Sequence, residues 1–225
     1  DVCSSDLTFT DLYYLRMGNT NLKPEETSQY NVGVTWSSSC GDWLRHFSIS
    51  ADGYYNTVKD KIVALPTMYV WKMMNMGEVD IKGVDVNLST QFRLPLRMSL
   101  LLASTYSFQY AVDVTDPEAK NYKDQIPYTP RHSGTVSVTL ENPWVNVSYI
   151  LTAVGDRYAL PQNIDRNRID SYIEQSISIN RDFRFRYFGL RLQGELLNLA
   201  NVNYDVIQYY PMPGRSWRLS ICLSY

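Results

Sequence analysis

The sequence has 225 residues, with 23 acidic and 21 basic side chains, and its net charge of −2 excludes the basic surface that nucleic-acid binding requires. Its longest wholly apolar run, near Leu100–Ala103, is far too short for a membrane-spanning helix. The mean hydropathy of −0.29 does not exclude a membrane β-barrel, because only one face of each strand would meet lipid.

Aromatic and sulfur-containing residues narrow the class of protein further. Eighteen tyrosines and five tryptophans are many for this length, and such rings suit interfacial belts, ligand-facing loops and sugar-binding surfaces. The three cysteines, Cys3, Cys40 and Cys222, are too widely spaced for a disulfide framework or a metal site. We therefore expect no resident metal ion and no cofactor.

The N-terminal segment differs from the rest of the chain. Residues 1–8 fit no strand pattern, so we expect a disordered end or a segment foreign to the natural gene. No secretory signal peptide is recognisable there, so an exported protein would have further sequence upstream. Gly18–Glu25, which is rich in Gly, Asn and Pro, is predicted to be a loop.

From residue 30 onward, apolar and polar side chains alternate in successive segments. This period of two places apolar residues on one face of a strand and polar residues on the other. The pattern predicts a partial strand at the N-terminus followed by nine full strands, which cover 30–36, 46–55, 77–92, 98–110, 134–140, 145–152, 173–179, 188–196 and 217–225.

The connections between these strands alternate in length, and no segment has a convincing helical period. The short turns are predicted at 37–42, 93–96, 141–143 and 181–186. The long loops are predicted at 59–76, 112–133, 160–168 and 198–214. Strands of about ten residues with this alternation are typical of outer-membrane barrels, which have short periplasmic turns and long extracellular loops. A β-sandwich has shorter strands and no such alternation.

The last nine residues show the strand pattern most clearly. Large apolar side chains occupy every second position: Trp217, Leu219, Ile221, Leu223 and Tyr225. A soluble sandwich strand would show the same alternation. However, the aromatic ring at each end matches an interfacial girdle, and the terminal aromatic residue resembles the C-terminal assembly signal of bacterial outer-membrane barrels.

Four blocks, in the correct order, resemble those of TonB-dependent outer-membrane receptors, which take up siderophores, haem and cobalamin. The blocks are Asp11–Tyr14 with Gly18–Glu25; Met76–Asp85; Ile126–His132; and Glu195–Leu199 with Tyr204, Pro213–Arg215 and the final strand. Four positions depart from the family pattern: Asp85 replaces a commoner Glu, Leu7 and Thr20 stand where many relatives have Pro, and the chain ends in Tyr rather than Phe.

The resemblance implies an all-β fold, with residues 9–225 forming the C-terminal part of an antiparallel transmembrane barrel. The family barrel has roughly 22 strands around a plugged lumen, so about ten strands would be a fragment without the plug domain. It also implies outer-membrane lipid, the missing plug and N-terminal strands, the barrel assembly machinery and the TonB energy-coupling complex as partners. The expected location is the outer membrane of a Gram-negative bacterium, and no enzymatic activity is expected.

Two groups of residues are candidates for contacts with a ligand or with the plug. Residues 68–76 combine flexible Met with flat aromatic rings, which suit a large, poorly hydrated metal chelate or vitamin. The ligand-contact candidates from this segment and from other loops are Met68, Tyr69, Trp71, Met73, Tyr122, Tyr158 and Tyr209. Tyr128 also falls in or near a predicted outer loop. For any single residue of 68–76, packing between loops is the better explanation, and most of the tyrosines are expected to form an interfacial belt rather than to contact ligand. Asp52, Asp85, Arg191 and Glu195 are expected to face the lumen, where buried charges should pair with each other or with the plug.

Other classes of protein fit parts of the sequence. One is a glycan-uptake receptor of the same family, and another is a passive porin. His46 and Ser48 share a strand face, as a barrel hydrolase would require, but the periplasmic end of a strand suits a surface histidine better. The last is a soluble, secreted β-sandwich that binds glycans.

Overall fold

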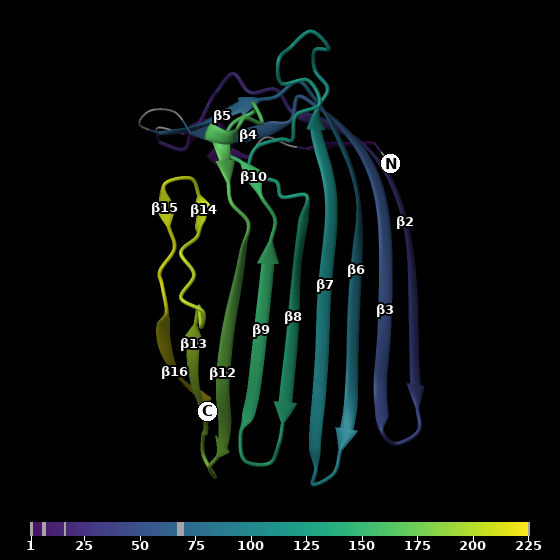
Figure 1. Cartoon of the computed structure of the whole chain (residues 1–225), viewed down its shortest axis with the longest axis vertical. Coiled ribbons are helices and arrows are strands. Elements are labelled where there is room, and N and C mark those ends of the chain that lie inside the picture. The colour runs from purple at the N-terminus through teal and green to yellow at the C-terminus, as the bar shows by residue number, and fades with distance from the viewer. Residues whose placement is uncertain (1, 6–7, 16, 67–69, 225) are drawn as a thin grey trace.

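A computed structural model describes residues 2–5, 8–15, 17–66 and 70–224, and its main feature is a ten-stranded antiparallel sheet (Figure 1). The strands follow one another across the sheet in chain order. They are β1 (Val2–Ser5), β2 (Glu25–Cys40), β3 (Leu44–Lys59), β6 (Glu78–Leu94), β7 (Met98–Asp113), β8 (His132–Glu141), β9 (Asn146–Val154), β12 (Tyr172–Arg184), β13 (Gly189–Leu197) and β16 (Ser216–Ser224).

The connections divide the sheet into two unlike ends, as the sequence predicted. Short turns join β2 to β3, β6 to β7, β8 to β9 and β12 to β13 at the lower end in Figure 1. The four long connections, 60–77, 114–131, 155–171 and 198–215, lie toward the opposite end. Consecutive antiparallel strands reverse direction, so every second connection lies at the same end of the sheet. The long loops, which are every second connection, therefore all lie at one end.

The register of the sheet gives it one apolar and one polar face. The cross-strand row Val34, Ala51, Val86, Tyr106, Gly134, Ala153 and Ile173 lies on one face. The adjacent row on the other face is Gly33, Asp52, Asp85, Ser107, Ser133, Val154 and Tyr172. The seven strands from β2 to β12 in this row therefore contribute to the same apolar face, which is the expected property of a barrel wall.

Large apolar side chains on this face are open rather than packed. Val32 is 73% exposed, Trp217 79% and Leu219 64%. The buried core is small and lies on the opposite face near the long loops, where it comprises Val58, Met76, Val79, Ile81, Ala111 and Ile126. A face this apolar and this open needs a non-aqueous neighbour, and hydrocarbon lipid satisfies that need.

The strands β2, β3 and β7 extend farther than the sequence pattern predicted. Each has 16 residues, against the predicted segments 30–36, 46–55 and 98–110, whereas β6 has 17 residues and nearly coincides with the predicted 77–92. At about 3.4 Å per residue, 16 residues span roughly 54 Å, about twice the apolar band of an outer-membrane barrel. The ladder continues beyond the apolar stretch because backbone pairing does not require apolar side chains.

Several local elements differ from the sequence expectation. Val2–Ser5 pairs with β2 through residues 25–28, although no strand was predicted there. Phe9–Tyr13 forms the helix α1, whose Thr8 and Asp11 make a capping box, so the expected absence of helix was wrong there. At five residues, α1 is too short to show a helical period. No helix in the described residues is long and apolar enough to cross a membrane.

The long loops also contain structure that the sequence did not predict. Three short hairpins project from the main sheet: β4 (Ile62–Pro66) with β5 (Trp71–Asn75), β10 (Arg157–Tyr158) with β11 (Arg168–Ile169), and β14 (Asp205–Ile207) with β15 (Tyr210–Pro211). A short 3-10 helix, η1 (Asp165–Asn167), precedes β11. Strands this short contain too few residues for an alternating pattern to be recognised.

We expect a charge near the middle of β16 to destabilise the protein much more on the apolar face than on the polar face. Ile221→Arg in the full-length protein should lower the free energy of unfolding from lipid vesicles by about 2–4 kcal/mol, because the guanidinium would face hydrocarbon. Ser220→Arg, on the opposite face, should change it by less than about 1 kcal/mol. Equal losses in urea titrations of the two variants would contradict the assignment of the faces.

Candidate functional site

A buried arginine joins two of the long loops. Arg157 on β10 is only 4% exposed, and its Nη2 donates hydrogen bonds to the backbone carbonyls of Asp205 at 2.6 Å and Val206 at 3.0 Å. Its guanidinium also lies over the ring of Tyr172, 5.6 Å from the centroid. Arg157 therefore connects loop 155–171 to β14 in loop 198–215.

Tyr172 also stacks on Tyr204 of loop 198–215, with ring centroids 4.1 Å apart. Contacts of Tyr128 extend this cluster to the other two long loops. The backbone N–H of Tyr128, in loop 114–131, donates to the carbonyl of Tyr158 at 2.7 Å. The Tyr128 ring lies 5.5 Å from that of Trp71, on β5 in loop 60–77. All four long loops therefore meet around Arg157 and Tyr128.

Burial sets the electrostatic character of the cluster. It lowers the pKa of Arg157, an effect that Tyr172, Tyr128 and Asp205 oppose, and the guanidinium stays charged because arginine starts from a very high value. Burial raises the pKa of Tyr128, and a hydrogen bond to the Gln208 backbone and the nearby Arg157 charge partly offset that rise. Tyr128 is thus a neutral phenol at physiological pH.

One donor atom in the cluster is unsatisfied within the described chain. The Nη1 atom of Arg157 is buried and has no hydrogen-bond partner among the described residues. An unpaired buried donor costs about 1–3 kcal/mol, and more when it is charged. Because Nη1 is closed to solvent, an acceptor oxygen would have to enter the cluster to pair with it.

A hollow of about 430 Å³ lies beside this cluster, within the range of small-molecule sites. Its wall contains two arginines, two tyrosines and several polar groups: Arg166, Arg168, Ile169, Asp170, Ser171, Asn203, Tyr204, Asp205, Gln208 and Tyr209. Arg168 is held by Asp156 at 3.8 Å and Asp170 at 3.6 Å. Such a surface can bind a ligand that carries both flat apolar parts and oxygen acceptors.

The structure brings some of the predicted loop residues together. Trp71 and Tyr158 both contact Tyr128, and Tyr209, which is 78% exposed, borders the hollow. Met73 is half-buried, and its backbone bonds to Met17 and Asn19. Tyr122 lies in loop 114–131 with Lys123 over its ring, 5.2 Å from the centroid. Met68 and Tyr69 lie outside the described residues.

The predicted lumen residues all lie on the polar face, but their surroundings differ. Arg191 pairs with Asp182 through two hydrogen bonds, at 2.6 and 3.1 Å, and Glu195 pairs with Arg218 at 2.5 Å. Asp52 and Asp85 are direct cross-strand partners, so their like charges face each other. Asp85 accepts a hydrogen bond from Ser107 at 2.5 Å.

The final strand occupies the position that the sequence predicted. Trp217, Leu219, Ile221 and Leu223 of β16 lie on the apolar face, and Tyr225 lies outside the described residues. Within the described chain no group of three or more His, Cys, Asp or Glu side chains is arranged to hold a metal ion.

Sequence reasoning missed Arg157, Tyr172, Tyr204, Arg166 and Arg168. The available signal for the first was the charged pair Asp156-Arg157 directly after an apolar strand. That signal does not reveal burial, because the acceptors of Arg157 lie 48 and 49 residues further along the chain.

Comparison with known proteins decides the family. Residues 5–199 match the family described as TonB dependent receptor-like, beta-barrel. The chain belongs to the TonB-dependent receptor family. This confirms the resemblance of the four sequence blocks, and the antiparallel sheet confirms the predicted fold class.

Curated relatives of this TonB-dependent receptor chain include two named Vitamin B12 transporter BtuB. The protein from Vibrio vulnificus is 24% identical over 217 residues, and that from Photobacterium profundum is 26% identical over 220 residues. Each alignment covers 93% of this chain but 32% of the relative. The chain therefore spans about a third of the length of these relatives.

Solved structures of TonB-dependent receptors share the fold. The copper transporter OprC matches with a TM-score of 0.70 at 15% identity, over 100% of this chain and 36% of its own. The unliganded ferric citrate transporter FecA matches with a TM-score of 0.68 at 12% identity, over 91% of this chain and 32% of its own. The names of the matched proteins are those of transporters and receptors rather than enzymes.

The fold explains the second glycine of the block Met76–Asp85, Gly83. Gly83 on β6 faces Tyr54 on β3, and a Cβ atom there would collide with the Tyr54 hydroxyl and the backbone carbonyl of Phe108. Only glycine lets the Tyr54 ring lie across the strand at this level.

The loop cluster predicts that Arg157 holds loops 155–171 and 198–215 together. In the full-length receptor, Arg157→Met should lower the local opening free energy of both loops by about 2–3 kcal/mol, because two charge-assisted hydrogen bonds are lost. Amide hydrogen exchange read by mass spectrometry measures this. Arg168→Met removes only exposed ion pairs and should change the exchange by less than about 1 kcal/mol. Unchanged exchange in Arg157→Met would contradict this role.

Proposed function

We propose that this chain is part of the wall and the extracellular loops of an energy-coupled uptake receptor in the outer membrane of a Gram-negative bacterium. The observation that carries the proposal is a sheet of this family with one apolar and one polar face. Its long loops meet at one end in a charged, aromatic cluster. The apolar face would contact lipid, and the loops would capture ligand outside the cell.

The proposed ligand is scarce, large and poorly hydrated, such as a ferric siderophore, haem or cobalamin. Flat rings and the unpaired Arg157 donor in the cluster suit a ligand with both apolar surface and oxygen acceptors. Because the matched curated relatives are named vitamin B12 transporters, cobalamin is the first ligand to test. Trp71, Tyr158 and Tyr209 lie in or beside the cluster and are the first proposed contacts. Met68, Tyr69, Met73 and Tyr122 are further proposed contacts from the same loops.

The polar face is proposed to receive the plug domain. Asp52 and Asp85 repel each other in this register, so a cationic side chain between them would stabilise the wall. Arg191 and Glu195 already have partners within the wall, which favours a structural role for these two residues. The remaining strands, the plug, TonB acting through the plug, and the barrel assembly machinery acting on the final strand are the proposed partners.

Uptake measurements test the proposal directly. Cells that express the full-length protein as their sole cobalamin receptor should accumulate radiolabelled cobalamin with saturation, and deletion of TonB should abolish this accumulation. Ferric siderophore and haem serve as alternative ligands in the same assay. Uptake of all three that is independent of TonB and proportional to concentration would indicate a passive porin. A full-length protein that is a soluble monomer without detergent would contradict the proposal altogether.

A further inference from the structure

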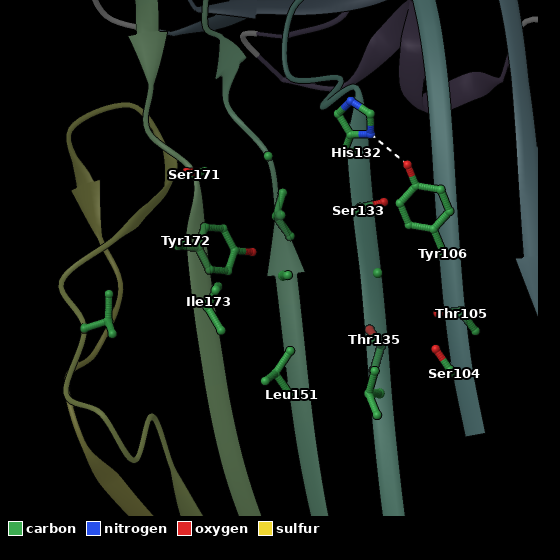
Figure 2. A pocket seen from close by; sticks show the side chains of 16 residues that line it. Ser104, Thr105, Tyr106, His132, Ser133, Thr135, Leu151, Ser171, Tyr172 and Ile173 are labelled. Carbon is green, nitrogen blue, oxygen red and sulfur yellow. Dashed lines mark hydrogen bonds between the residues drawn. The ribbon is translucent and has the colours of Figure 1, made fainter. Parts of the chain in front are cut away.

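The apolar face contains a groove of about 700 Å³ near the long loops (Figure 2). Most of the residues that line it belong to β7, β8, β9 and β12. Eight of these have side chains on the apolar face: Ser104, Tyr106, His132, Gly134, Val136, Leu151, Ala153 and Ile173. Its floor is made of small residues, Gly134 and Ala153, which lie in one cross-strand row between Tyr106 and Ile173. Three strand spacings separate these walls, so the groove is about 14 Å wide between backbones.

The upper end of the groove is polar. His132 and Tyr106 share a hydrogen bond of 2.9 Å between Nδ1 and the hydroxyl, shown dashed in Figure 2. The backbone N–H of Gly155 donates to the carbonyl of His132 at 2.8 Å, and Ser171 also lines this end of the groove from the β12 side. A phenol and an imidazole at the edge of an apolar surface match the interfacial level of a membrane.

Two cations lie directly beyond this polar edge. The His132 ring is 5.2 Å from that of Phe108, and Tyr110 follows two residues later on the same face of β7. Lys82 and Arg131 both lie over the Tyr110 ring, at 5.1 and 5.3 Å. Within the described residues, neither cation has a carboxylate within ion-pair distance. These two exposed charges are therefore available to an external anion.

We propose that this groove and its cations bind an anionic lipid of the outer leaflet. An acyl chain would fill the groove over Gly134 and Ala153, while the lipid phosphate would meet Lys82, Arg131 and His132. The lipid is the chosen occupant because the groove is continuous with the apolar belt and opens below a cationic pair. Such a lipid matches the site, because its apolar chain and its phosphate follow each other in the same order as the apolar groove and the cations.

The groove adjoins the ligand cluster but lies on the opposite face of the sheet from Asp52 and Asp85. Ser171 borders both the groove and the hollow around Tyr204 and Tyr209, and Tyr172, which stacks on Tyr204, also lines the groove. The inference rests on the proposed placement in the outer membrane, but not on which ligand is transported.

Lipid retention by the full-length receptor tests the site. The receptor is placed in phosphatidylcholine nanodiscs that contain lipid A, released into mild detergent, and weighed by native mass spectrometry. Wild type should retain lipid A, and Lys82→Gln with Arg131→Gln should reduce retention about tenfold to thirtyfold, because two cations near an anionic surface are lost. Lys82→Gln alone, which leaves the hydrogen bond of Arg131 to Gln125 intact, should reduce it about fivefold.

Filling the groove is an independent arm of the test. Ala153→Phe should reduce retention roughly tenfold by occupying the space of the acyl chain. The controls are Ala51→Phe, on the same face away from the groove, and Lys120→Gln, in an exposed loop, and both should retain lipid like wild type. Equal retention by wild type and all variants would overturn the site. A wild type that transports its ligand but retains no lipid A would overturn the lipid site alone.

Discussion

The structure depends on one constraint: backbone hydrogen bonding fixes the register, and the register decides which side chains share a face. A shift of one residue would move every apolar side chain of a strand to the polar face. The pairing of Leu192 with Ile221 and of Glu195 with Arg218 shows that β13 and β16 meet this constraint together. Because the same alternation continues back to β2, a single sheet can separate two environments.

This constraint also explains how much of the fold the sequence predicted. A period of two is a strong signal in segments such as 217–224, where the alternation is sustained, so the nine full strands were found in order. It is a weak signal where pairing uses polar residues, so β2, β3 and β7 are longer than the sequence predicted. Val2–Ser5 and the loop hairpins are held by backbone pairing, which leaves no mark on the pattern.

The loop cluster was less predictable for a different reason. Tyrosines in predicted loops could be named from composition, and Trp71, Tyr158 and Tyr209 do lie in or beside the cluster. The burial of Arg157 depends on carbonyls from a distant loop, and the stacking of Tyr172 on Tyr204 depends on how loop 198–215 folds back. Such contacts between loops arise only when the sheet has brought their ends together. Similarly, the groove over Gly134 and Ala153 exists only because neighbouring strands align small residues in one row.

The central claim is that odd-numbered residues of β16 face lipid and even-numbered residues face the lumen. A nitroxide scan of residues 217–223 in the full-length receptor, reconstituted in lipid vesicles, tests it most directly. We expect collisions with oxygen, which concentrates in hydrocarbon, to peak at positions 217, 219, 221 and 223, and collisions with a water-soluble nickel chelate to peak at 218, 220 and 222. Accessibility to both reagents without a period of two would contradict this account of the sheet.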